Sequence, residues 1–180
     1  MITMEQVVLV DKNDNQIGSM EKLAAHKGQG TLHRAVSVLL YRKKDGKTEV
    51  LLQQRGTVKP LWPSFWSNTI CTHPIDGEST LDCAVRRLKE EMGIDVSSDQ
   101  LAFVDKLLYQ AHYVQDLSEY ELDHIFVGQW DGPISLNTEE AIEYQWKPWD
   151  DLVLDMQKNP TQYTPWFNKL VLEVPLPFVD

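Results

Sequence analysis

Stretches of apolar and β-branched residues, separated by polar turns, run along most of the chain and predict a protein rich in strands. Near the start, residues 7–10 and 16–18 flank the polar segment 11–15, which predicts an N-terminal β-hairpin. The pair Asp45-Gly46 indicates a second tight turn between two strands. The remaining expected strands are 35–41, 50–54, 101–113, 120–130 and 143–146.

One segment has a clear helical period. Its apolar residues recur every three or four positions, at Leu81, Val85, Leu88 and Met92. Ser79 followed by Asp82 is a variant of the capping box, with Asp in place of the usual Glu. Gly93 suits the left-handed position at which many helices end. The pattern therefore predicts a helix over residues 79–92.

Two further helices are indicated by prolines, because proline fits the first turn of a helix. One is expected to start at Pro148 and the other to follow Thr164-Pro165. Several strands with a few interspersed helices predict an α/β (α+β) fold, with a mixed β-sheet between helices and the N-terminal hairpin as an extension. Since no repeat or linker-like tract interrupts the chain, residues 1–180 are expected to form one domain.

Composition and charge argue against several classes of function. The formal net charge is −10 and the pI about 4.9, which argues against a long polyanion such as nucleic acid and against an anionic membrane surface. Two cysteines, Cys71 and Cys83, fit a reducing compartment better than a disulfide framework. The first residues carry neither a cationic region nor a long apolar run, so a cytoplasmic location is expected.

The segment around the predicted helix resembles the Nudix box, a loop–helix–loop motif in which glutamates bind metal beside a diphosphate. The matching residues are Glu78, Arg86, Glu90, Glu91 and Gly93. Two positions depart from the motif. Thr72 replaces the opening glycine, and Arg87 replaces a glutamate of the metal-binding cluster.

The arginine at position 87 changes the electrostatics of that helix. A helix with a guanidinium in place of this carboxylate is better suited to bind phosphate oxygens than to bind several metal ions. The alternative is that Arg87 and Glu91 form only an ion pair four residues apart on the helix surface. The helix sequence leaves both interpretations open.

A more specific resemblance comes from the residues before the helix. The segment Asn68-Thr69-Ile70-Cys71-Thr72-His73-Pro74, followed by the Nudix-like helix, is similar to the type I isopentenyl-diphosphate isomerases. Other segments match that family in order and rough spacing, so the resemblance covers nearly the whole chain. They are residues 21–26, 32–35, 119–121 and 163–166. The resemblance implies a Nudix-like sheet and an intramolecular isomerase of isoprenoid precursor biosynthesis.

The resemblance groups residues that spacing alone could not join. It implies that His26, His33, His73, Glu119 and Glu121 form a metal site. Three imidazoles and two carboxylates suit Mn²⁺, Zn²⁺ or Mg²⁺. Glu119 and Glu121 are two apart on a predicted strand, as are Cys71 and His73, so each pair is expected to share a face. Glu91 would bind a second ion, Mg²⁺, that reaches the substrate diphosphate.

The family interconverts isopentenyl diphosphate and dimethylallyl diphosphate by protonation and deprotonation through a carbocation-like state. The resemblance implies that Cys71 and Glu121 transfer the protons, Tyr109 hydrogen-bonds the carboxylate, and Trp166 faces the cation. The expected diphosphate-binding cations are Lys22, Arg55, Lys59 and Arg87. Trp62 and Trp66 either line the pocket or pack in the core, and one of them is expected to line the pocket. His112, His124 and Cys83 are interpreted as ordinary structural residues.

Two other functions compete with the isomerase. A Nudix hydrolase of a nucleoside diphosphate derivative would need the full glutamate cluster, which Arg87 interrupts. A non-catalytic binding module with this fold would not need Cys71 and Glu121. The sequence leaves the oligomeric state open between monomer and homodimer. It also leaves open whether the apolar segment 174–178 packs on the domain, covers the site or contacts another subunit.

Overall fold

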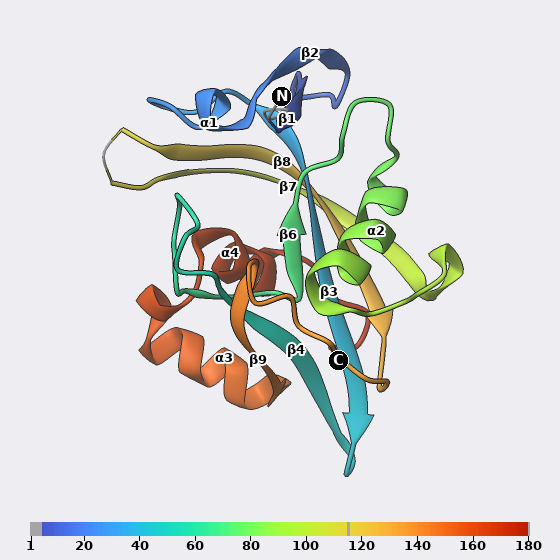
Figure 1. The fold of residues 1–180 in the computed structure, drawn as a ribbon. Coiled ribbons are helices and arrows are strands. Elements are labelled where there is room, and N and C mark those ends of the chain that lie inside the picture. The colour runs from blue at the N-terminus through green and yellow to red at the C-terminus, as the bar shows by residue number, and fades with distance from the viewer. Residues whose placement is uncertain (1–4, 115, 180) are drawn as a thin grey trace.

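The computed structural model describes residues 5–114 and 116–179 (Figure 1). The strands are β1 (Gln6–Val10), β2 (Gln16–Glu21), β3 (His33–Lys44), β4 (Lys47–Arg55), β5 (Trp66–Ser67), β6 (Ile70–Thr72), β7 (Leu101–His112), β8 (Ser118–Gln129) and β9 (Ala141–Pro148). The α-helices are α1 (Lys22–Ala25), α2 (Thr80–Met92), α3 (Trp149–Lys158) and α4 (Pro165–Glu173). Two short 3₁₀ helices span Ser98–Gln100 and Pro160–Gln162.

The long strand β3 organises a mixed sheet. It pairs antiparallel with β1, β4 and β6 and parallel with β8. β7 pairs antiparallel with β8, and β9 with β4. The parallel pair sets His33 opposite Glu121, while the antiparallel pair sets Ser37 opposite Cys71. Three strands that are distant in sequence therefore bring chemistry-bearing residues to one part of the sheet.

Helices cover both faces of this sheet (Figure 1). Val36, Val38 and Leu40 of β3 pack in one cluster with the buried face of α2. Leu39, which points the opposite way because side chains alternate along a strand, packs in a second cluster with residues of α3 and α4. A central strand apolar on both faces is what a sheet between two helical layers requires. The predicted mixed sheet between helices is confirmed.

The N-terminal hairpin is confirmed as β1 and β2. Its second strand leads into the one-turn helix α1, an element that the sequence did not predict. The carboxylate of Glu21 caps that turn by accepting hydrogen bonds from the backbone amides of Leu23 and Ala24, at 2.9 and 2.8 Å. The turn places His26 at the start of β8, where the amide of Ser118 donates to the His26 carbonyl at 2.8 Å.

Helix α2 begins and ends where its sequence predicts, with one difference. The Ser79 hydroxyl accepts from the amide of Asp82 at 3.0 Å, as in a capping box. The Asp82 carboxylate, however, accepts from the Ser79 hydroxyl at 2.6 Å, because Asp is one methylene shorter than the usual Glu. At the other end, Gly93 has φ 62°, and a Cβ there would lie 2.7 Å from Ser135. Only glycine fits this close approach.

The C-terminal segment packs on the domain. Val174 and Leu176 are buried in the cluster that includes α3 and α4. The Phe178 ring lies against Tyr41 and Trp149, with ring centroids 4.6 and 5.4 Å away. Packing, one of the three alternatives for this segment, is therefore confirmed. Separately, no helix in the described ranges is long and apolar enough to cross a membrane.

Candidate active site

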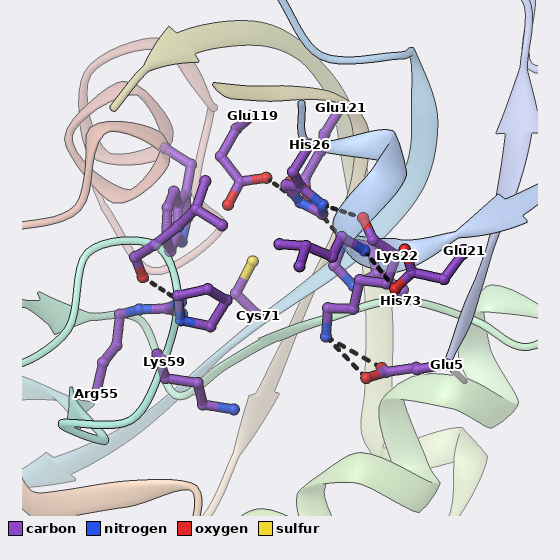
Figure 2. A pocket seen from close by; sticks show the side chains of 14 residues that line it. Glu5, Glu21, Lys22, His26, Arg55, Lys59, Cys71, His73, Glu119 and Glu121 are labelled. Carbon is purple, nitrogen blue, oxygen red and sulfur yellow. Dashed lines mark hydrogen bonds and ion pairs between the residues drawn. The ribbon is translucent and has the colours of Figure 1, made fainter. Parts of the chain in front are cut away.

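A cavity of about 330 Å³ opens between the N-terminal hairpin, the loop after β4, and strands β6 and β8 (Figure 2). It is lined by Glu5, Glu21, Lys22, Leu23, His26, Arg55, Lys59, Pro60, Leu61, Cys71, His73, Glu119, Glu121 and Trp166. Figure 2 shows the Cys71 sulfur between an end that carries Glu119 and Glu121 and an end that carries Arg55 and Lys59. The pocket thus combines apolar surface with groups of both charges.

Strand geometry explains how these side chains meet. Glu119 and Glu121 are two apart on β8, and Cys71 and His73 are two apart at the end of β6. Successive side chains on a strand alternate in direction, so each pair points the same way. All four residues line the cavity, as their spacing predicts.

Three histidines and one glutamate converge beside the pocket. One ligand atom from each of His26, His33, His73 and Glu121 lies within 4.8 Å of every other. Glu121 Oε1 is 2.8 Å from His73 Nε2 and 3.3 Å from His33 Nε2, and the two Nε2 atoms are 3.2 Å apart. Ligands about 2.1 Å from a common ion are separated by about 3 Å, so the spacing fits a divalent cation.

The backbone orients two of these rings for that purpose. The Nδ1 atom of His26 donates to the carbonyl of Lys22 at 2.6 Å, and that of His33 donates to the carbonyl of Thr31 at 2.7 Å. Each bond places the proton on Nδ1 and aims Nε2 inward, the arrangement typical of metal-binding histidines. The Nδ1 atom of His73 is buried and has no hydrogen-bond partner among the described residues.

Charges in the group perturb one another strongly. Burial lowers the pKa of His26, but the Glu119 carboxylate outweighs burial and raises that pKa to about 9. Burial lowers the pKa of His73 to about 3. Burial alone would raise the pKa of Glu121, yet the neighbouring imidazoles of His33 and His73 hold it well below its ordinary value. An ionised carboxylate is therefore maintained among the imidazoles.

The structure places two of the expected metal ligands differently. Glu119 lies outside the four-residue group, with Oε2 2.7 Å from the Nε2 atom of His26. Glu91 is buried on α2 and does not line the cavity; it accepts from Gln53 at 3.3 Å and pairs with Arg87. Through Arg87 and Glu140, however, Glu91 is connected to Lys59, which does line the cavity.

The expected proton-transfer residues are brought together. The Tyr109 hydroxyl donates a short hydrogen bond to Oε2 of Glu121, while Oε1 faces the histidines. Burial, together with the charge of Glu121, raises the pKa of the Cys71 thiol well above its ordinary value. Cys71 thus remains a neutral thiol at the pocket wall, close to an ionised carboxylate.

Trp166 lines the pocket although its side chain is 1% exposed. Its Nε1 donates to Ser67 at 3.1 Å, and the guanidinium of Arg55 lies 4.9 Å from the ring centroid. Trp62 packs edge-on against it, with centroids 5.6 Å apart. Neither Trp62 nor Trp66 lines the cavity, so the expectation that one of them does is wrong.

Three of the four expected diphosphate-binding cations reach the pocket. Lys22 pairs with Glu5 at 3.1 Å, and Lys59 pairs with Glu140. Arg55 donates to the carbonyls of Leu61 and Trp62, at 2.9 and 3.1 Å. The fourth cation, Arg87, does not line the cavity.

Arg87 makes the ion pair that its spacing allows, but the pair is not a surface one. Its Nη2 atom lies 2.7 Å from the buried carboxylate of Glu91 and 3.1 Å from Glu140. In the same Nudix-like motif, Arg86 donates two hydrogen bonds of 2.7 and 2.8 Å to the Glu78 carboxylate. The motif's charges are therefore largely satisfied by one another.

Sequence reasoning missed two acidic residues near the pocket. Glu140 bridges Lys59 and Arg87, although nothing in its local sequence marks it out. Asp123 is fully buried and accepts from the Ser37 hydroxyl at 2.7 Å. Burial, with the nearby charge of Glu121, raises the pKa of Asp123 well above its ordinary value. Its spacing, two residues after Glu121 on the same strand, was the available signal.

Structural roles, as expected from the sequence, are found for Cys83, His112 and His124. Cys83 is buried in the cluster around α2. His112 Nδ1 lies 3.0 Å from the Ser118 hydroxyl, and His124 Nε2 lies 2.9 Å from Asp14. None of these three residues lines the cavity or joins the metal-ligand group.

Similarity to solved structures agrees with this architecture. The fold matches DR0079 from Deinococcus radiodurans with a TM-score of 0.71 at 15% identity, covering 93% of this chain and 98% of that one. It also matches a MutT protein from Methanosarcina mazei with a TM-score of 0.58 at 19% identity, covering 78% and 91% of the two chains. Residues 31–167 match the NUDIX domain family. A mixed sheet between helices with a glutamate-bearing helix is thus a Nudix fold.

Sequence relatives narrow the class further. The chain is 43% identical over 163 residues to an isopentenyl-diphosphate Delta-isomerase of Serratia proteamaculans, covering 91% of this chain and 87% of that one. It is 39% identical over 162 residues to isopentenyl-diphosphate Delta-isomerase 2 of Aromatoleum aromaticum, covering 90% and 82%. The chain belongs to the isopentenyl-diphosphate Delta-isomerase family, as its motifs predicted.

Proposed function

We propose that this protein interconverts isopentenyl diphosphate and dimethylallyl diphosphate, a step that supplies isoprenoid precursors. The observation that carries the proposal is the meeting of Cys71 and Glu121 in one pocket, beside three histidines and above a cationic end. An alkene is a very weak base, so its protonation needs a positioned acid, a base and stabilisation of the tertiary cation.

Cys71 and Glu121 are proposed as the proton-transfer pair, on opposite sides of the substrate carbon skeleton. One delivers a proton to the terminal alkene carbon, which leaves a cation at the branched carbon; the other removes a proton from the neighbouring methylene. The reverse reaction exchanges these roles. A thiol suits one side because a neutral thiol enters an apolar pocket at a smaller desolvation cost than a carboxylate. Tyr109 orients Glu121 through its hydrogen bond.

His26, His33, His73 and Glu121 are the residues that would hold a Zn²⁺, Mn²⁺ or Mg²⁺ ion. A bound ion supplies fixed positive charge beside Glu121. Glu119, which adjoins His26, remains a proposed fifth ligand. Glu91 remains the proposed ligand of a Mg²⁺ ion shared with the diphosphate, together with phosphate contacts from Arg87.

The remaining pocket residues divide by the part of the substrate that they suit. Lys22, Arg55 and Lys59 are proposed to bind the diphosphate, since all three cations line the cavity. Leu23, Leu61 and Trp166 offer apolar surface to the five-carbon chain. The ring of Trp166 would stabilise the cation by about 1–2 kcal/mol when water is excluded.

The decisive experiment follows isomerisation in deuterated water with purified protein, with and without a chelator. The proposal expects deuterium in the allylic product and loss of turnover after chelation. Release of phosphate or pyrophosphate without isomerisation would overturn it in favour of the hydrolase alternative. Binding of the diphosphate without any turnover would favour a binding module.

A further inference from the structure

The carboxylate of Glu140 joins three parts of the molecule that lie apart in the sequence. It pairs with Lys59 of the loop after β4, which lines the pocket, and with Arg87 of α2, 3.1 Å away. Arg87 in turn lies 2.7 Å from Glu91. Glu140 is therefore the contact between the pocket rim and the Nudix helix.

The backbone holds Glu140 against both neighbours. The amide of Gly56 donates to the Glu140 carbonyl at 3.0 Å, and a Cβ at Gly56 would lie 3.0 Å from that oxygen. On the other side, the turn that precedes Glu140 is attached to α2, because the amide of Asn137 donates to the Glu91 carbonyl at 2.8 Å. The carboxylate thus projects from a doubly anchored turn into the space between two cations.

Two cations placed side by side repel each other, and both are flexible side chains. A carboxylate between them offsets that repulsion and restricts both heads to one region. On the proposed function, this region is where a diphosphate would arrive. We propose that Glu140 is a positioning residue that holds Lys59 and Arg87 in place for the diphosphate. It acts through these cations and does not itself touch the substrate.

The opposite effect is the natural competitor. A carboxylate that occupies the cations could merely compete with the diphosphate, in which case its removal would tighten binding. The two roles therefore predict opposite signs for the same variant, Glu140→Gln. Glu139→Gln is the matched control, because Glu139 is the adjacent glutamate, is exposed, and makes no ion pair within the described ranges.

The experiment measures two quantities on wild type, Glu140→Gln, Glu140→Asp and Glu139→Gln. The first is the dissociation constant of inorganic pyrophosphate with Mg²⁺, by calorimetry. The second is the KM and kcat for isopentenyl diphosphate. For Glu140→Gln we expect about tenfold weaker pyrophosphate binding and about tenfold higher KM, with kcat within about twofold, the scale of one charge-assisted contact. Glu140→Asp should recover part of the loss, and Glu139→Gln should match wild type.

Unchanged or tighter pyrophosphate binding by Glu140→Gln would overturn the inference, as would an equal loss in Glu139→Gln. Thermal melting separates a folding defect from a binding defect. If Glu140→Gln melts early, a double-mutant cycle with Glu140→Asp and Lys59→Met decides, because a positioning role requires the effect of Glu140→Asp to shrink when Lys59 is absent. A wild type that binds pyrophosphate but does not isomerise would refute the proposed reaction alone, and the pyrophosphate measurements would still test Glu140.

Discussion

The two ends of the pocket are built by different means. At the histidine end, short side chains project from paired strands and a capped turn, and backbone carbonyls orient the rings of His26 and His33. At the cationic end, the long side chains of Lys22 and Lys59 are held by other charged side chains. His33 is fully buried, whereas the side chain of Lys22 is 33% exposed.

The difference suits two tasks. Proton transfer needs donor and acceptor held within tenths of an ångström, and a strand scaffold with backbone contacts provides that rigidity. A diphosphate with its ion is a mobile, highly charged group. Long cationic side chains can exchange their carboxylate partners for phosphate oxygens and so adjust to its position. Substitutions at the histidine end should therefore lower kcat, whereas substitutions at the cationic end should mainly change KM.

The largest effect is expected at Cys71. Cys71→Ala removes one of the two proposed proton-transfer groups, so kcat should fall by about 10³-fold or more while the fold and bound metal persist. Steady-state assays, thermal melting and metal analysis test this. Cys83→Ala is the matched control, because Cys83 is on the buried face of α2 and does not line the pocket. Near-full activity of Cys71→Ala would refute the assigned role of the thiol.

Removal of a histidine should come next. His73→Ala takes one nitrogen from the four-residue group, and we expect loss of one metal ion per chain with at least about a hundredfold loss of kcat. Metal content after dialysis is the direct readout, with His112→Ala as control. Retention of the ion by His73→Ala would show that His73 is not one of its ligands.

A smaller effect is expected at Tyr109. Tyr109→Phe deletes one charge-assisted hydrogen bond to Glu121, which is worth about 1.5–3 kcal/mol and corresponds to about a 10- to 100-fold fall in kcat with KM little changed. Tyr113→Phe is the control, because Tyr113 packs on Trp62 away from Glu121. A rise in KM without a fall in kcat would place Tyr109 in substrate binding instead.

The smallest effect is expected at the rim. Glu5 and Lys22 form a partly exposed pair, and such pairs contribute little to stability. Glu5→Gln should leave the melting temperature unchanged and lower KM by about twofold, since the substrate no longer displaces a carboxylate from Lys22. Glu173→Gln breaks a comparable exposed pair with Lys169 on α4 and should change neither quantity. A large loss of kcat in Glu5→Gln would contradict the expectation that substitutions at the cationic end mainly change KM.

Local sequence signals account for most of the fold. Strand alternation, the Asp45-Gly46 turn and the caps of α2 depend on neighbouring residues, so each could be predicted without knowing the tertiary structure. The helix α1 could not, because one turn carries almost no periodic signal and its stability comes from the Glu21 cap.

The site was predictable only where spacing or resemblance supplied the missing distance information. Spacing placed Glu119 with Glu121 and Cys71 with His73, and the family resemblance joined them to His26 and His33. Neither spacing nor resemblance indicated Glu140, because its partners come from a loop and a helix far away in the chain. The expectation that Trp62 or Trp66 lines the pocket was wrong, because the sequence does not distinguish an aromatic residue beside a pocket from one in the core.

The parallel pairing of β3 with β8 has a consequence for how the molecule folds. A tight turn cannot close a parallel pair, and many intervening residues must be ordered before His33 meets Glu121. A slip of one residue would turn Glu121 toward α2 and scatter the histidine group. An ion that binds only the correct register stabilises that register by mass action. Metal uptake should therefore be among the last events of refolding. The histidine group would bind the ion only when β3 and β8 are paired in the correct register.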